Sequence, residues 1–175
     1  EASRYAELVL LERAGKITTD TDQGSITGLY TILVEGDDMT EPIADAARGI
    51  LDGHVILSRK LAHKGQFPAV DVLDSVSRVA DDVITPEHSA ARRQVCRMMA
   101  IYKDVEDLVQ IGAYAKGSNP EADVAIEANR LIIDLLRQGK GDVTTFEQAR
   151  GTLLKLAKDT AELSNKLIKA KSGGR

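Results

Sequence analysis

The segment RGILDGHVILSRKLAHKGQFPAVDVLDSVSR, residues 48–78, sets the fold class of the first half of the chain. Within it, His54–Leu57 predicts a short apolar strand, and a second extended segment starts at Pro68. Residues 58–64 between them predict a short helix that Gly65 ends. Strand, connecting helix and strand is the order typical of a parallel α/β sheet. Because two strands do not make a stable open sheet, we expect the edge of a larger one.

The residues before this segment predict three further elements. Ser3–Ala14 has the pattern of an amphipathic helix. Ser25–Val34 is rich in β-branched residues and predicts a buried strand. Pro42 then begins a helix over residues 43–51, because proline fits the first helical turn.

The residues after this segment predict long helices. Apolar residues spaced three and four apart indicate a helix over 87–115, with Thr85 as its N-cap. Further helices are expected over 120–137 and 146–170. Aromatic residues make up only 3% of the chain, so we expect these helices to pack through aliphatic side chains.

The predicted fold class is therefore α+β and mostly α, with two parts. Residues 1–85 predict a fragment of an α/β domain, and residues 86–175 predict a helical bundle. Hydrophobic residues make up 43% and charged residues 29% of the chain, as in an ordinary globular protein.

Composition excludes several classes of function. The net charge of −4 argues against a general nucleic-acid-binding protein. Cys96 is the only cysteine, which excludes an intrachain disulfide and fits a reducing compartment. His54, His63 and His88 lack the spacing of a metal site. The sequence has no G-x-x-x-x-G-K-[ST] phosphate-binding loop.

Acidic residues follow the predicted strand that ends at Val34. In open α/β sheets, ligands bind beyond the carboxyl ends of strands, so carboxylates there could orient water or a metal-bound ligand. The alternative is that these residues cap the helix at Pro42 and favour its positive end. The acidic residues are Glu35, Asp37, Asp38 and Glu41.

Two residues at the ends of the second extended segment are further candidates. Arg78 could stabilise transition-state charge on a neighbour's nucleotide. Alternatively, it could be a structural arginine paired with Asp71, Asp74 or Asp81. Phe67 could stack on a base, or it could pack on the adjacent Pro68. From the residues alone, both alternatives stay open.

Several long runs of the sequence resemble the catalytic subunits of flagellar and type III secretion export ATPases, which are relatives of rotary ATP synthase subunits. The runs occur in the family's order and cover most of the chain up to about residue 160. They are LLERAG from Leu10, GSITGLYTILVEGDDMTEPIAD from Gly24, RGILDGHVILSRKLA from Arg48, FPAVDVLDSVSR from Phe67, and DLVQIGAYAKGSNPEAD from Asp107.

This resemblance implies roles for the candidate residues. The family forms homohexameric rings of P-loop ATPase domains that bind ATP with Mg²⁺ between subunits. By position in the motif, Arg78 resembles the arginine finger, the side chain that reaches a neighbour's ATP. Phe67 lies where relatives place an aromatic ring against adenine. Asp38 and Glu41 lie in the GDD-x-x-EP segment near the nucleotide interface.

The same resemblance implies a location and partners. The chain corresponds to the C-terminal part of a cytoplasmic subunit, peripheral to the inner membrane at the export gate. The expected partners are a central stalk protein, a regulatory stator-like protein, export chaperones and cargo, and no nucleic acid. The Walker loop, which with the rest of the upstream half binds most of the ATP and Mg²⁺, is missing, so this chain alone is expected to be inactive. The alternatives are a non-catalytic helical interaction module and a fragment of a rotary ATP synthase or vacuolar-type subunit.

Overall fold

The computed structural model describes residues 14–16, 24–34, 36 and 40–172. The chain divides into two compact units between His54 and Val55, and each is described by itself. The predicted helix Ser3–Ala14 lies outside the described residues, apart from Ala14.

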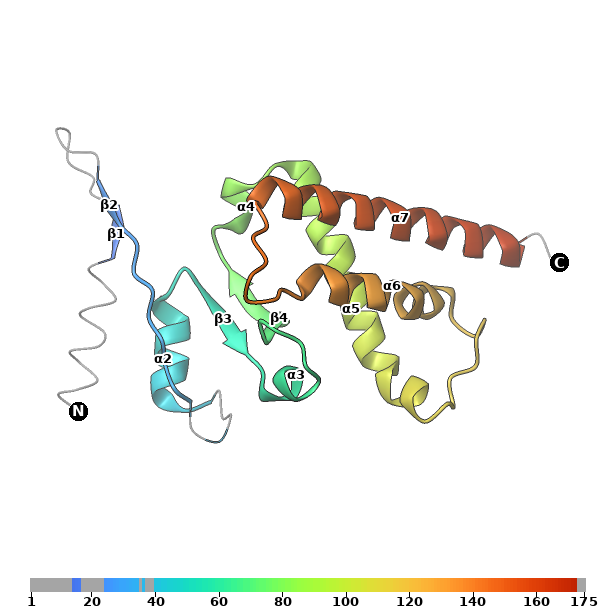
Figure 1. The fold of residues 1–175 in the computed structure, drawn as a ribbon, viewed down its shortest axis with the longest axis horizontal. Helices are drawn as coiled ribbons and strands as arrows, with labels where there is room; N and C mark the ends of the chain where they lie inside the picture. The colour runs from blue at the N-terminus through green and yellow to red at the C-terminus, as the bar shows by residue number, and fades with distance from the viewer. Residues whose placement is uncertain (1–13, 17–23, 35, 37–39, 173–175) are drawn as a thin grey trace. The chain divides into compact units, whose positions relative to one another are not determined.

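The first unit contains a minimal sheet. Strands β1 (Gly15–Lys16) and β2 (Ser25–Ile26) pair antiparallel, with Gly15 opposite Ile26 (Figure 1). The strand that we expected over residues 25–34 therefore stops after Ile26. Beyond it, Leu29 and Leu33 are 96% and 95% exposed, so the described chain gives this segment no surface on which to pack.

The first unit also contains the predicted helix at Pro42. Helix α2 (Pro42–Ile50) has the proline in its first turn, as the sequence predicted. One face of the helix buries Ala44 and Ala47, each 4% exposed.

The next part of the fold is the strand–helix–strand segment that the sequence predicted, whose first strand spans the boundary between the two units. Strands β3 (Gly53–Leu57) and β4 (Val70–Ser77) are neighbours in a two-stranded sheet, and α3 (Arg59–His63) connects them. The Ser58 hydroxyl caps α3 by accepting a hydrogen bond from the Leu61 N–H at 3.4 Å. The short predicted helix is thus confirmed.

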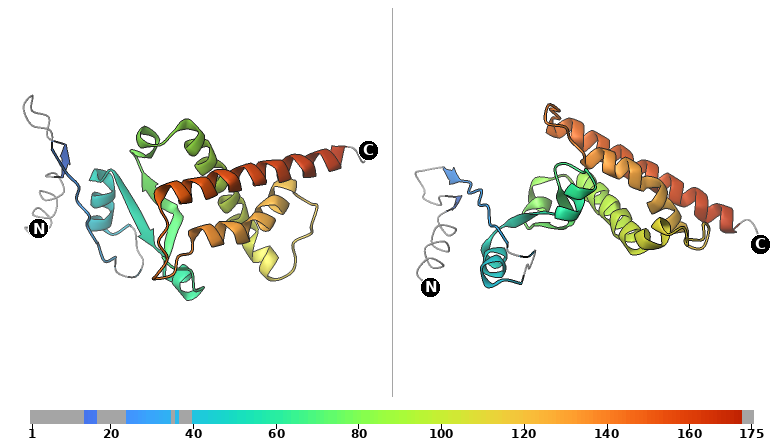
Figure 2. Two further views of the ribbon diagram at one scale, coloured as in Figure 1. Left: turned by 45° about the horizontal axis from the view of Figure 1, so that its top comes forward. Right: turned by 60° about the horizontal axis from the view of Figure 1, so that its bottom comes forward.

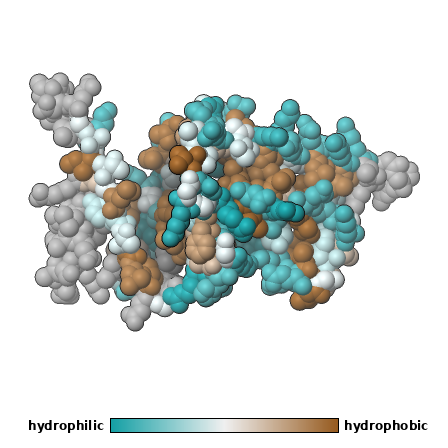
Figure 3. All heavy atoms as spheres, viewed as in Figure 1, coloured by the Kyte–Doolittle hydropathy of each residue, from teal (hydrophilic) through white to brown (hydrophobic). Residues whose placement is uncertain are grey.

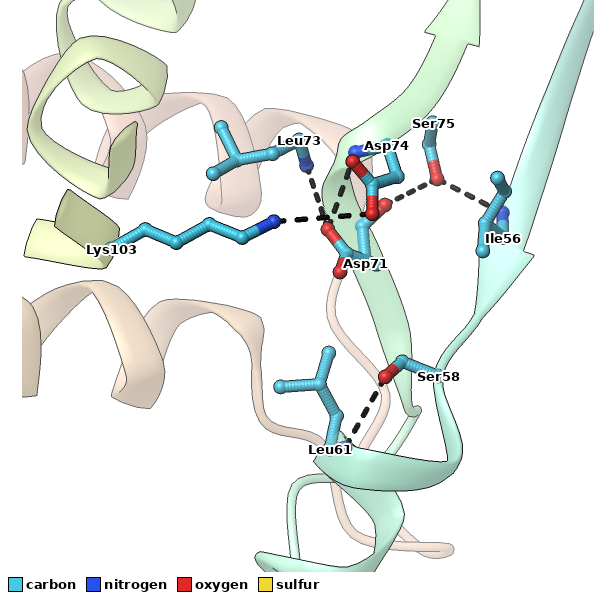
Figure 4. A network of polar contacts seen from close by, with 8 residues as sticks. All are labelled: Ile56, Ser58, Leu61, Asp71, Leu73, Asp74, Ser75 and Lys103. Atoms are coloured by element: carbon cyan, nitrogen blue, oxygen red, sulfur yellow. Dashed lines mark hydrogen bonds and ion pairs between the residues drawn. The ribbon is translucent and has the colours of Figure 1, made fainter. Parts of the chain in front are cut away.

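The direction of the two strands corrects one expectation. The Ser58 N–H, just after β3, donates to the carbonyl of Ala69, just before β4, at 2.8 Å. This bond joins the end of one strand to the start of the next, and the two arrows run in opposite directions (Figure 4). The pair is therefore antiparallel rather than parallel, because the chain turns back through α3 and enters β4 beside the end of β3 that it has just left.

A three-helix bundle forms the rest of the second unit. After the short α4 (Ala80–Val83) come α5 (Pro86–Gln110), α6 (Pro120–Leu136) and α7 (Phe146–Ser172), each of which packs on the other two (Figure 2). The core is aliphatic, as the composition predicted. Its small residues let the helices approach closely. The buried residues are Ala91, Val95, Met98, Val124, Ala125, Ala128, Ile132, Leu156 and Ala157.

Helix α5 ends five residues before its predicted end. Gly112 has a φ of 70°, a left-handed conformation that stops the helix. The N–H groups of Ala113 and Tyr114 then both donate to the carbonyl of Leu108, at 2.8 and 3.1 Å. These hydrogen bonds satisfy the Leu108 carbonyl, which would otherwise lack a partner at the end of the helix. The chain then continues toward α6.

The surface is mixed in character. On the face shown in Figure 3, hydrophilic side chains lie between apolar ones over the helical bundle. On β3, Val55 and Leu57 are 69% and 70% exposed, so this side of the strand covers no core within the described residues. Among the described helices, none is both long and apolar enough to cross a membrane.

Candidate functional site

The two strongest candidate residues flank β4. Phe67 lies three residues before the first residue of the strand, and Arg78 directly follows its last residue. An eight-residue strand is about 26 Å long when fully extended. Phe67 and Arg78 therefore lie beyond opposite ends of β4.

Phe67 is fixed by its backbone and exposed through its ring. It follows Gly65, which has a φ of 70°, and the buried Gln66. Its carbonyl accepts a hydrogen bond from the N–H of Gln138 at 2.7 Å, which ties this segment to the connection after α6. Phe67 is 56% exposed, which leaves surface for a ligand.

Hydrogen bonds within β4 and to β3 fix the shape of the strand (Figure 4). The Asp71 carboxylate accepts from the backbone N–H groups of Leu73 and Asp74, at 3.1 and 3.2 Å. The Ser75 hydroxyl donates to the Asp71 carbonyl and accepts from the Ile56 N–H of β3 at 3.0 Å. The Asp71 carboxylate therefore stabilises the backbone conformation of its own strand.

Two ion pairs connect this region to α5. Lys64 Nζ lies 2.7 Å from Glu106 Oε1, and Lys103 Nζ lies 3.9 Å from Asp74 Oδ2. Exposed pairs of this kind contribute about 0–1 kcal/mol each. They favour the observed arrangement only weakly, so the backbone hydrogen bonds of β4 remain its main support.

Arg78 lies in the turn that follows β4. The turn, residues 78–79, leads directly into α4, and the Arg78 side chain is exposed. An exposed arginine at the end of a strand can reach an anion on another molecule with its guanidinium group.

A polar cluster joins α4 to the start of α5, three residues beyond Arg78. Asp81 Oδ1 accepts from the Ser89 hydroxyl at 2.6 Å and from Arg92 at 3.0 Å, and Arg93 donates to the Ser89 hydroxyl at 2.7 Å. The Ser89 hydrogen bond, helped by the charges of Arg92 and Arg93, lowers the pKa of Asp81. The sequence did not single out this cluster, because α4 is too short to give a periodic pattern.

The acidic segment is described only in part. Glu41 is half-buried at the N-cap of α2, and its side chain makes no capping hydrogen bond. Glu41 therefore does not cap α2 through a side-chain hydrogen bond. Its carboxylate still belongs to the residue at the positive end of the helix, where a negative charge is favourable. Asp38 lies outside the described residues. A shared role of both residues with Phe67 and Arg78 stays a prediction.

The other reactive residue types form no site in the part of the chain that the structure describes. There, no group of three or more His, Cys, Asp or Glu residues could hold a metal ion. Burial raises the pKa of the half-buried Cys96 thiol, which disfavours its reactive thiolate form.

Two family models match the chain in succession. Residues 3–77 match the nucleotide-binding domain of the ATP synthase alpha/beta family. Residues 84–155 match the C-terminal domain of the T3SS EscN ATPase. Phe67 and β4 lie in the first match, and the helical bundle lies mostly in the second.

Known relatives agree with both matches. The chain is 47% identical, over 147 residues, to the flagellum-specific ATP synthase of Bacillus subtilis, covering 84% of this chain and 33% of the relative. The chain thus spans about a third of the length of this curated relative.

Two solved structures show the same fold. The assembled ATPase EscN of the enteropathogenic E. coli type III secretion system is 41% identical, with a TM-score of 0.82, covering 89% of this chain and 37% of that one. EscN in complex with its central stalk EscO is also 41% identical, with a TM-score of 0.75, covering 87% of this chain and 35% of that one. The chain therefore belongs to the ATP synthase alpha/beta nucleotide-binding family over residues 3–77 and to the type III secretion ATPase C-terminal family over residues 84–155.

Proposed function

We propose that this chain is the C-terminal part of an ATPase subunit that energises flagellar or type III protein export. The observation that carries the proposal is the placement of Phe67 and Arg78 at opposite ends of β4. Because an eight-residue strand lies between them, the two residues would serve different ATP molecules, as the resemblance implies. Phe67 would contact the adenine of its own subunit's site, and Arg78 would reach the phosphates at a neighbour's site.

Such a shared site requires a ring of subunits. A head-to-tail interface repeated around a closed ring gives every site one adenine contact and one arginine finger. This supports the homohexamer that the resemblance implies. The solved relative is likewise described as an assembled ATPase.

The phosphate chemistry would lie mainly in the rest of the subunit. Bound Mg²⁺ would neutralise charge on the β- and γ-phosphates, and the phosphate-binding loop would hold them. This chain fits the edges of such a site, with an exposed aromatic ring and an exposed guanidinium. Asp38 and Glu41 would lie near the interface, as the resemblance implies. The change from ATPase domain to helical domain would fall near residue 85, close to the gap between the two family matches.

A second function is proposed for the helical bundle, which would bind the central stalk. The supporting observation is that a relative with this fold has been solved in complex with its central stalk. Export chaperones, cargo, a stator-like regulator and the export gate at the inner membrane are further proposed partners, and the subunit would be cytoplasmic. The 41% identity to the export ATPase EscN, against 22% to an ATP synthase subunit from Nanoarcheaum equitans, favours the export branch.

Replacing Phe67 by alanine in the intact subunit tests the proposed adenine contact. Stacking on a base contributes about 1–3 kcal/mol, so KM for ATP should rise roughly 5- to 150-fold. The value of kcat should change less, because the adenine does not react. Steady-state ATPase kinetics on the assembled ring measure both constants.

The matched control is Phe67→Tyr, which keeps an aromatic ring at the same position and should keep KM within about threefold of the unaltered ring. An unchanged KM in the alanine variant would contradict the adenine contact and favour simple packing of Phe67 on Pro68.

A further inference from the structure

We infer that Asp81 is a positioning residue for Arg78, holding the turn that carries the finger against the helical bundle. The inference rests on the proposed function of Arg78 and adds to it a residue that would not touch nucleotide. Asp81 follows Arg78 by three residues and lies in the middle of α4, the element that the Arg78 turn enters.

Helix α4 has little else to hold it. It is four residues long, buries none of its residues, and has no side-chain hydrogen bond at its N-cap, Val79. So short a helix is not stable by itself. Its place must come from contacts with other elements, and the contacts of the Asp81 carboxylate supply them.

On α5, the partner of Asp81 is a buried residue. Ser89 is 5% exposed and lies in the first turns of α5, two residues before Ala91 and six before Val95, both in the bundle core. Its hydroxyl donates to Asp81 Oδ1 at 2.6 Å. A short hydrogen bond from a buried hydroxyl to a carboxylate is among the stronger polar contacts.

Two arginines complete the cluster. Arg92 adds a second, charged hydrogen bond to the same Asp81 oxygen at 3.0 Å. Arg93 donates to the Ser89 oxygen at 2.7 Å, which leaves the hydroxyl proton to point toward Asp81. The Ser89 hydrogen bond lowers the pKa of Asp81, which agrees with contacts that favour the ionised carboxylate, the form that accepts both bonds.

The Arg78 turn is therefore fixed on both sides. Before Arg78, the Ser75 hydroxyl of β4 accepts a hydrogen bond from the Ile56 N–H of β3, and after Arg78 the Asp81 cluster holds α4. The guanidinium of an arginine finger must lie close to the phosphate that is transferred. A shift of about 1 Å can lower the rate of the reaction by up to about 100-fold. Loosening α4 would let the turn move, although the guanidinium itself stays unchanged.

The experiment replaces Asp81 by asparagine in the intact, ring-forming subunit, with and without Arg78→Ala. With Arg78 present, kcat should fall about 10- to 100-fold while KM for ATP stays within about threefold, since adenine binding lies at the other end of β4. With Arg78→Ala, the Asp81 change should have no further effect, because a residue that acts through Arg78 has nothing left to position. A sensitive radiometric phosphate-release assay reads the low rates.

Two further variants complete the design. Ser89→Ala removes the hydroxyl from the other side of the contact and should lower kcat in the same direction even if Asp81→Asn assembles poorly. Asp82→Asn, an exposed neighbour, is the matched control and should leave kcat unchanged.

Three outcomes distinguish the claims. Normal kcat in both Asp81→Asn and Ser89→Ala would overturn the inference, and so would an equal loss with and without Arg78. If Arg78→Ala itself keeps normal turnover, the finger role fails, which is a separate result.

Discussion

Replacing Arg78 by alanine in the intact subunit should lower ATP turnover by roughly 10³-fold or more. The guanidinium would stabilise charge that develops on a neighbour's phosphates in the transition state, so its loss should appear in kcat rather than in KM. Arg78→Lys should recover little of the rate, because an ammonium group lacks the planar fork that binds two phosphate oxygens at once.

The matched control for this prediction is Arg130→Ala. Arg130 is an exposed arginine on α6, so its removal changes the net charge of the subunit by the same amount. Turnover is measured on rings of confirmed size, so that loss of assembly is not mistaken for loss of chemistry. Near-normal turnover of the Arg78 variant would leave Arg78 a structural residue.

The purified 175-residue chain should show no ATP turnover, although it should still bind the central stalk protein of its export system. Turnover needs a loop of backbone N–H groups around the phosphates, and the sequence has no such loop. The proposed stalk binding would need only the helical bundle, which has its own buried core.

Phosphate release and a stalk-binding titration, each with and without nucleotide, measure the two properties. The chain with Arg78→Ala is the control for contaminating ATPases, because activity that this change does not alter comes from another protein. Robust turnover that depends on Arg78 would contradict the proposed division of the site. Loss of stalk binding would leave the helical bundle without its proposed partner.

The helices could largely be predicted from the sequence because their boundaries are local. Pro86 and Pro120 each lie in a first helical turn, and the side chains of Thr85 and Asn119 accept the capping hydrogen bonds. These devices act within one or two turns of chain. Helix α5 ends earlier than the sequence predicts. A glycine inside a helical pattern does not by itself show that its backbone is left-handed, as that of Gly112 is.

The strands could be predicted less well because their structure depends on distant neighbours. Ser25–Val34 has the composition of a strand, but strand propensity is realised only where neighbouring strands and a packing surface exist. With Leu29 and Leu33 almost fully exposed, only Ser25–Ile26 pairs. Element order alone predicts a parallel pair for β3 and β4, but it does not report which ends of the two strands lie side by side.

The candidate site could be predicted in part. The sequence already places Phe67 and Arg78 at the two ends of one extended segment, and the structure gives the bounds of the strand between them. The hydrogen-bonded cluster around Asp81 joins residues eight and eleven positions apart across two helices. No periodic pattern reports such a contact, so it needed the fold.

A subunit-mixing measurement decides whether Arg78 serves a neighbour. One intact subunit carries Arg78→Ala, and the other carries a disabled phosphate-binding loop in the part of the subunit outside this chain. Each variant alone should be nearly inactive. In rings assembled from equal amounts, up to about a quarter of the sites would pair an intact loop with a neighbour's intact Arg78. We predict that mixing restores turnover toward that fraction, and a mixture as inactive as its two components would contradict a finger that acts between subunits.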